Sequence, residues 1–307
     1  MEIDIKNKIY QAQCIGNVEP IEYMIPYPSM RSLIEGQNIK YAEQVIIKDK
    51  NITNQTFFNY VQQTSHWLES LGLEPKDRMI IPELGYPQAE ILLYGIWNLG
   101  AIGVLAVDVD KNNIKDIVSP KLNIDAKTNL FEKIKEQPID YKPKYKPLLD
   151  DEALLTFEKE DGIRLSHYNL LVNTNGIQKA IGLKSRTKVF CDLKPRSSAW
   201  VIFQVILPIY CGCIFDRSNA EITFGDSKNN YNLRNDINNI AEFAGNDIGL
   251  CPENTAAICI GNEPIHLTSY SKENTKIKIK GHSVMMGYLN ALKNESSFNN
   301  EGLFISV

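Results

Sequence analysis

The strongest constraint on the fold is a regular alternation of helical and extended segments in the first third of the chain. Residues 54–71 carry apolar side chains at helical spacing, and Gly72 follows as an expected C-terminal cap. A short strand is expected at 77–82, and a second helix at 87–99 begins with a proline. The apolar run 101–107 is typical of a parallel strand covered on both faces. This order predicts an α/β protein with layered, doubly wound lobes and mostly parallel sheets.

The rest of the chain continues the pattern less regularly. Ser166 is a good N-cap for a helix that should run to Ile181 and end at Gly182. The polar segment 218–247 offers only a short helix at 233–244, and the proline-rich first fifty residues are expected to be irregular. Further strands are expected at 154–157, 187–193, 256–260 and 276–280 (KIKIK), the last with one face in water.

One apolar stretch has to be weighed as a membrane span. Residues 199–215 are nearly all apolar, but they are slightly short for a span and contain Gln204 and Pro208. A buried helix that breaks at Pro208 and leads into a buried strand explains the same composition. We therefore expect no membrane-spanning segment.

Composition excludes several functional classes. The net charge of −4 comes from scattered basic residues, without the stripe of a nucleic-acid binder. The six cysteines fit neither a zinc ribbon nor a CxxC motif, and the N-terminus is not a signal peptide, so a cytoplasmic protein with reduced thiols is expected. Cys211 and Cys213 are expected to lie on one buried face of a strand.

Several stretches, taken together, resemble the adenylate-forming superfamily of acyl-CoA synthetases, nonribosomal peptide synthetase adenylation domains and luciferases. Their order along the chain matches the order in that superfamily. The matching stretches are NQTFFNYVQQTSHWLESLGLEPKDRMIIPEL (54–84), YPQAEILLYGIWNLGAIGVLAVDVD (86–110), GIRLSHYNLLVN (162–173), LCPENT (250–255), IKIKGHSVMMGYLNALKNESSF (277–298) and GLFIS (302–306).

The resemblance implies the domain organisation. It implies a first αβ lobe at 1–150, a shortened second αβ lobe at 151–265 and a small β-rich lobe at 266–307. The boundary near 150 follows a proline-stiffened linker, YKPKYKP. The family's C-terminal catalytic domain, with its lysine, and the aspartate that holds the ribose would both come after Val307, so we expect both to be absent.

The family's phosphate loop has lost its chemistry here. In the family this loop is rich in glycine, hydroxyl groups and lysine. Glycines let the backbone approach phosphate, hydroxyl groups donate hydrogen bonds to it, and lysine neutralises its charge. The corresponding stretch, 156–162, reads TFEKEDG and keeps only Gly162. A carboxylate near 4 Å from a phosphate costs about 1 kcal/mol in water and about 4 kcal/mol at an effective dielectric constant of 20. We therefore expect this loop to repel ATP.

Three positions remain that match functional positions of the family. They are Gly162 after the loop, Ser166 at a helix start, and Glu253, which matches a magnesium-binding glutamate. We expect all three to serve structure, with Glu253 as a cap or surface residue. His167 follows the helix start, where capping and packing are expected, and the other histidines lack metal-ligand spacing. No catalytic residue, cofactor or metal is predicted.

The resemblance and the losses together favour a non-catalytic relative of these enzymes. It would act by binding an acyl or amino-acid ligand, a carrier protein or a partner synthetase. One alternative is a reduced but active carboxylate-activating or acyl-transfer enzyme, completed by a separate subunit. Another is a structural subunit, such as a homodimer. Neither nucleic acid nor membrane is expected as a partner.

Overall fold

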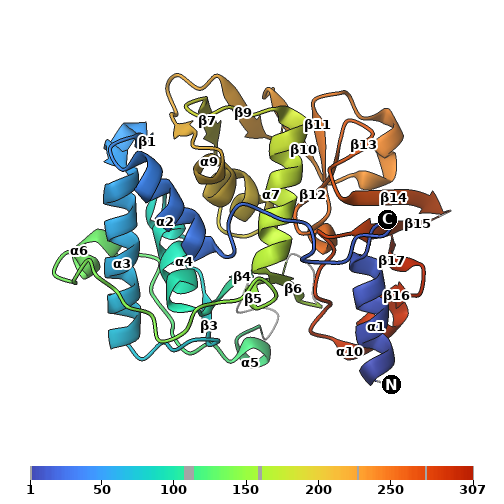
Figure 1. Ribbon diagram of the computed structural model, residues 1–307, viewed down its shortest axis with the longest axis horizontal. Helices are drawn as coiled ribbons and strands as arrows, with labels where there is room; N and C mark the ends of the chain where they lie inside the picture. Colours follow the sequence, from blue (N-terminus) through green and yellow to red (C-terminus); the bar gives the residue numbers. More distant parts are fainter. Residues whose placement is uncertain (1, 107–113, 158–160, 227, 274, 307) are drawn as a thin grey trace.

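The structure, a computed structural model, describes residues 2–106, 114–157, 161–226, 228–273 and 275–306. Its strands form three sheets, and the long helix α7 (His167–Ile181) stands between the first two (Figure 1). The expected α/β class is confirmed, with mostly parallel pairing in two sheets and wholly antiparallel pairing in a small third sheet.

The first sheet has nine strands, and its centre is parallel. Its antiparallel pairs lie at the two ends. In spatial order the strands are β13 (Glu263–Pro264), β12 (Ala257–Ile260), β11 (Asp247–Leu250), β10 (Tyr231–Arg234), β9 (Ile222–Gly225), β7 (Lys188–Cys191), β8 (Ile214–Phe215), β1 (Val45–Ile47) and β2 (Ile52–Thr53).

The second sheet has four strands and joins residues on both sides of position 150. Strands β4 and β5 pair in parallel, although the expected lobe boundary lies between them in the sequence. The strands are β3 (Arg78–Ile80), β4 (Ile102–Ala106), β5 (Glu152–Phe157) and β6 (Ile163–Ser166). Helices on this side are α2 (Met30–Tyr41), α3 (Asn54–Ser70), α4 (Gln88–Leu99), α5 (Ile114–Val118) and α6 (Leu130–Ile134), and a 3₁₀ turn η1 (Lys48–Lys50) follows β1.

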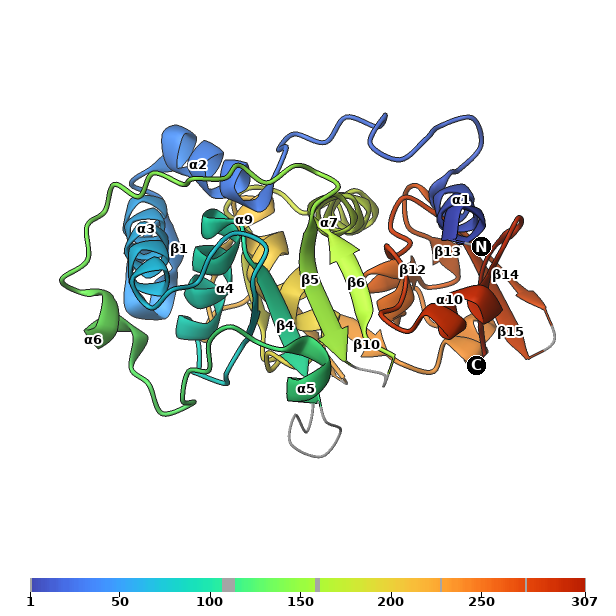
Figure 2. The same ribbon diagram turned by 90° about the horizontal axis from the view of Figure 1, so that it is seen from below.

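The third sheet packs against the N-terminal helix. Helix α1 (Glu2–Gln13) packs against it, so both ends of the described chain lie at the same end of the molecule (Figure 2). The KIKIK strand alternates between buried and exposed side chains, as the sequence predicts. The sheet contains β14 (Thr268–Glu273), β15 (Lys276–Gly281), β17 (Gly302–Ser306) and β16 (Phe298–Asn299), and α10 (Ala291–Ser297) precedes β16.

The helix ends follow the sequence signals closely. Ser166 caps α7, and Gly182 ends it in the left-handed conformation at φ 73°. Helix α4 ends in the same way at Gly100, with φ 91°. Gly72, one residue beyond the C-cap of α3, has φ 88°. The expectations for Ser166, Gly182 and Gly72 are confirmed.

Two expectations about secondary structure are wrong. The first fifty residues are largely ordered into α1 and α2, because packing on the third sheet and a Ser29 cap supply what the local pattern lacks. The expected helix at 233–244 does not form. Its first two residues belong to strand β10, and a 3₁₀ helix, η3 (Ile237–Glu242), follows. Pairing of β10 with β9 and β11 overrides the helical spacing of its apolar residues.

The apolar stretch 199–215 is buried, as expected, but it does not break at Pro208. It forms α8 (Ser198–Trp200), a π-helix η2 (Val201–Ile206) and α9 (Leu207–Tyr210) in one continuous path. The wider π-helical turn accommodates Pro208, which would clash with the preceding turn of a regular α-helix. No helix in the described ranges is both long and apolar enough to cross a membrane.

The expectation for Cys211 and Cys213 is also wrong. Both lie in the turn before β8, on either side of Gly212, which has φ 64°. Cys213 is nevertheless buried, and all six thiols are free in the structure. Their reduced state in the native protein remains a prediction.

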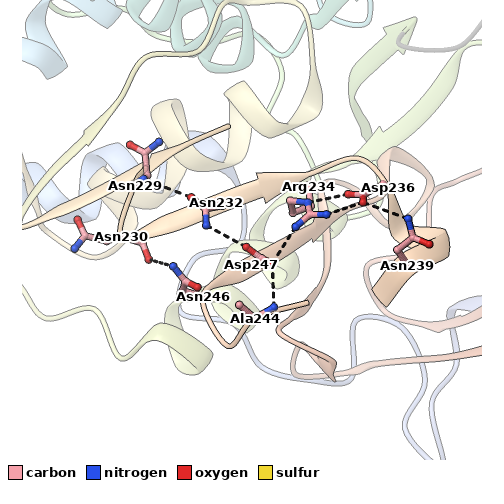
Figure 3. Close-up of polar contacts among 9 residues, drawn as sticks. All are labelled: Asn229, Asn230, Asn232, Arg234, Asp236, Asn239, Ala244, Asn246 and Asp247. Atoms are coloured by element: carbon pink, nitrogen blue, oxygen red, sulfur yellow. Dashed lines mark hydrogen bonds and ion pairs between the residues drawn. The ribbon is translucent and has the colours of Figure 1, made fainter. Parts of the chain in front are cut away.

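Strands β9 to β11 of the nine-stranded sheet have one polar face. The pairing register places Thr223, Asn232 and Arg234 on the face opposite the buried Phe224 and Leu233. Asn232 and Arg234 donate to the Asp247 carboxylate at 3.1 Å each, and Arg234 also binds Asp236 (Figure 3). The described residues between β9 and β11 include a 3₁₀ helix but no α-helix. Polar side chains therefore occupy a face that helices cover in most parallel sheets.

Candidate functional site

Three segments, 162–169, 251–257 and 282–289, meet in what we call the central junction, and its first segment begins at Gly162. At Gly162 the backbone has φ 61°, and its carbonyl accepts from Leu289 N at 2.8 Å. A Cβ atom there would lie 3.0 Å from both the Phe157 ring and the Leu289 side chain. Gly162 is therefore required by local packing.

Ser166 and Asn169 form a complete capping box at the start of α7. Asn169 N donates to Ser166 Oγ at 3.1 Å, and Ser166 N donates to Asn169 Oδ1 at 3.0 Å. The Asn169 amide also donates to the carbonyls of His282 and Val284, at 3.0 Å each. The S-H-x-N motif thus fastens the helix start to the third segment of the junction.

One turn further along α7, Asn173 fastens the helix to the second segment, 251–257. Its amide donates to the carbonyls of Asn254 and Ala257 at 3.0 and 2.9 Å, and its oxygen accepts from Ala257 N at 3.2 Å. Asn173 is fully buried, so these bonds satisfy a group that would otherwise be costly to bury. Helix α7 therefore holds the junction together through two asparagines spaced four residues apart.

Glu253 lies inside the protein, on the 3₁₀ turn η4 (Pro252–Asn254). It is only 1% exposed, so the expectation of a surface residue is wrong. Its Oε1 accepts from the Tyr288 hydroxyl at 3.0 Å, and its Oε2 lies 3.6 Å from the Cys251 thiol. Burial first, and the Glu253 carboxylate second, raise the pKa of Tyr288, so its hydroxyl stays protonated and donates. Both carboxylate oxygens thus have protein partners.

Thr255 is the strained residue of the junction. It has φ 70° and ψ −69°, which is rare for a β-branched side chain. Its hydroxyl donates to the Ser283 carbonyl at 2.7 Å, and the residue is fully buried. Strain of this kind persists only where surrounding contacts hold it, and it is concentrated at functional sites.

The three family-matching positions therefore meet on one segment, 282–289. Leu289 contacts Gly162, Val284 contacts the capping box of Ser166, and Tyr288 contacts Glu253. Positions 158–160 of the acidic loop lie outside the described residues. The aspartate that ends that loop, at 161, accepts from the Asn290 amide at 3.1 Å and lies 3.7 Å from a lysine at 293.

A cleft of about 600 Å³ opens beside the junction. Helix α1 contributes Ile5 and Ile9 to its walls, and the junction contributes Arg164, Ser166 and Met286. Arg164 Nε donates to the Glu152 carboxylate at 2.7 Å, which fixes the direction of its guanidinium. The size and the mixture of apolar walls with a few polar groups are those of small-molecule sites.

The histidines do not form a metal site. Among the described residues, no cluster of histidine, cysteine, aspartate and glutamate could hold a metal ion. His167 is fully buried at the start of α7, and burial lowers its pKa to about 4. Its Nδ1 has no hydrogen-bond partner within the described ranges. The packing role expected for this residue fits its position.

Sequence reasoning missed the residues that complete the junction. Asn173 and Tyr288 were visible only as ordinary helix and motif residues, and their partners are 84 and 35 positions away. It also missed Glu90, a buried carboxylate within the apolar helix α4. A charge in an otherwise apolar helical run was the available signal for that residue.

Neither a protein-family model nor a curated protein sequence matches this chain. Solved structures do match. The structure is similar to apo MatB from Rhodopseudomonas palustris, with a TM-score of 0.71 and 12% identity over 91% of this chain and 75% of that one.

Two further solved structures agree. The anthranilate CoA ligase AuaEII in complex with anthranoyl-AMP gives a TM-score of 0.73 and 14% identity, covering 92% of this chain and 75% of that one. McyG A-PCP complexed with phenylalanyl-adenylate gives 0.73 and 12% identity, covering 93% of this chain and 64% of that one. The chain therefore has the adenylate-forming fold, which confirms the expectation from its motifs.

Proposed function

We propose that this chain is a non-catalytic protein with the adenylate-forming fold, and that it acts by binding. The observation that carries the proposal is the state of Glu253. A magnesium ion prefers close carboxylate oxygens together with several retained waters. Here the matching carboxylate is 1% exposed and accepts from the Tyr288 hydroxyl. Freeing it would leave a buried tyrosine without its acceptor.

The loop chemistry supports the same conclusion. Gly162 is enclosed by Phe157 and Leu289, and Asp161 faces Asn290 and Lys293. Lys293 is therefore directed at a carboxylate of this loop end. In the sequence, two more acidic residues at 158 and 160 outnumber the single lysine at 159, so the loop is negatively charged and disfavours a polyphosphate.

The bound molecule that we propose is a small carboxylic acid of the acyl or amino-acid class, held in the cleft beside α1. The apolar walls suit its hydrocarbon part. Lys6 and Arg164, whose Nε is held by Glu152, outnumber Asp150 in the cleft wall and suit its carboxylate. The solved structures with the same fold support this class, because two of them contain acyl or aminoacyl adenylates. A carrier protein or partner synthetase remains the alternative binding partner.

Two measurements test the proposal. Isothermal titration with Mg-ATP should show no binding at millimolar concentration, and carboxylate-dependent pyrophosphate exchange should stay at background over a broad panel of acids. A micromolar dissociation constant for Mg-ATP, or exchange above background with any acid, would show that the protein is an enzyme.

The binding half of the proposal needs its own test. The same panel of acids is titrated into the wild type and into Ile9→Trp, which fills the cleft from α1. At least one acid should bind the wild type and lose affinity in the variant. Ile39→Trp is the matched control, because Ile39 is an exposed helical isoleucine, at 84%, that does not line the cleft. Equal binding to all three proteins would place the ligand elsewhere.

A further inference from the structure

A second, smaller cavity lies far from the junction in the sequence and has an unusual wall. It is enclosed by α4, η2, α9 and the β1–β8 edge of the large sheet, and its volume is about 20 Å³. By the same measure, a single water needs roughly 10–15 Å³. Most of its wall is apolar, as in Phe57, Val205, Ile209 and Phe215, and Tyr86 stacks on Phe215 at 4.3 Å.

Glu90 and Gln204 are the polar exceptions in this wall. Glu90 Oε1 accepts from Gln204 Nε2 at 2.7 Å and from the Trp200 indole at 3.1 Å. The Gln204 oxygen is occupied, because it accepts from Leu193 N at 2.9 Å. Glu90 Oε2 has no hydrogen-bond partner in the part of the chain that the structure describes. A residue in the cavity wall therefore has one carboxylate oxygen without a protein partner among the described residues.

An unpaired carboxylate oxygen in a mostly apolar cavity favours a small ligand that carries a cationic hydrogen-bond donor. Glu90 is 4% exposed, and leaving a buried acceptor unpaired is costly. A neutral donor would satisfy the hydrogen bond, but a cationic donor would also neutralise the buried charge. The neighbouring π-helix is a second indication, because π-helical turns are rare and often occur at functional sites.

We propose that this cavity receives the ammonium end of a small primary alkylamine, with the ammonium donating to Glu90 Oε2 and its first carbon against the apolar wall. The volume admits one to two water-sized groups, so the buried part of the guest is the ammonium and about one carbon, and any further carbon lies toward the surface. The site is separate from the cleft beside α1 and does not rest on the proposed function.

The test uses ethylammonium chloride as the probe and the Trp200 indole N–H as the reporter. This N–H donates directly to Glu90, so its ¹H–¹⁵N resonance should shift saturably when the ammonium binds. The indoles of Trp67 and Trp97 are internal controls outside the cavity wall. A probe with three non-hydrogen atoms binds at best with a dissociation constant on the order of 1 mM, so the titration extends to tens of millimolar. The titration is made at mildly alkaline pH and constant ionic strength, with ethanol and acetate as neutral and anionic counterparts.

Two variants test separately the charge of Glu90 and the free volume of the cavity. Glu90→Gln keeps the shape but removes the charge, and it should weaken ethylammonium binding at least about tenfold. Val205→Leu keeps Glu90 but adds a methylene to the wall, and it should abolish the shift even if Glu90→Gln fails to fold. Glu253→Gln is the matched control, since it removes a buried carboxylate away from this cavity and should leave binding unchanged.

Each outcome of the titration either supports or overturns the ammonium site. A saturable Trp200 shift with ethylammonium alone, lost in Val205→Leu, supports the site. Equal shifts with ethanol would mean that the cavity selects shape without charge, and would overturn the ammonium assignment. The absence of a saturable shift at tens of millimolar probe would also overturn it, leaving a cavity filled by water alone.

Discussion

Glu90 gives the stability of this protein a pH dependence whose sign is unusual for a carboxylate. Burial raises its pKa from 4.5 to about 7, although hydrogen bonds from Gln204 and Trp200 lower it in part. In the unfolded chain the carboxylate regains its ordinary pKa. The folded state therefore holds this proton more tightly than the unfolded state.

The magnitude follows from the two pKa values. Because the folded pKa is the higher one, the stabilisation from Glu90 is complete below pH 4.5 and is lost as pH rises to about 7. At about 1.36 kcal/mol per pKa unit, the loss amounts to roughly 3 kcal/mol. The group is almost fully buried, so little of this is screened by solvent.

Urea unfolding of the wild type and Glu90→Gln, at a series of pH values, measures this quantity. The free energy of unfolding of the variant, minus that of the wild type, should rise by roughly 3 kcal/mol between pH 4.5 and 7. Other titrating groups, His167 among them, are present in both proteins and cancel in the difference. Two parallel stability profiles would refute the reasoning, because they would mean that Glu90 titrates alike in both states.

Three further predictions concern single residues. Burial lowers the pKa of His167 from 6.5 to about 4, so the wild type should lose roughly 3 kcal/mol relative to His167→Gln as pH falls over that range; a constant difference in urea unfolding would contradict this. Gly182→Ala should cost about 1 kcal/mol because φ is 73°, whereas Gly245→Ala, also in open space but without positive φ, should be near neutral; equal thermal shifts would show that backbone strain is not the cause. Ser166→Ala should cost about 1 kcal/mol in urea unfolding through loss of the cap, and Ser166→Gly clearly less; equal costs would remove the capping argument.

The sequence predicts elements whose stability is local. The helix from Ser166 to Gly182 was predictable to the residue, because both end signals are side-chain or backbone properties of single positions. Strand β15 was predictable for a similar reason, since alternation specifies a half-buried strand by itself.

Elements decided by distant partners were not predictable in this way. Strand β10 has apolar residues that continue at helical spacing into η3, and only pairing with β9 and β11 selects the extended form. Glu90 meets Gln204 across 114 positions, and Asn173 meets Ala257 across 84. The motifs located the central junction, but the burial of Glu253 depends on Tyr288, which no local pattern connects to it.

The polar face of strands β9 to β11 makes it hard to add a helix there. An amphipathic helix inserted between β10 and β11 would have to cover Asn232, Arg234 and Asp247, and would remove their ion pair and amides from water. Desolvating such a pair can cost more than its attraction returns. The helix would have to be inserted and the face made apolar at the same time. An apolar face without a covering helix would be an exposed hydrophobic patch, which favours aggregation. Evolution, or an engineer, can therefore lengthen this region most easily by adding polar loops.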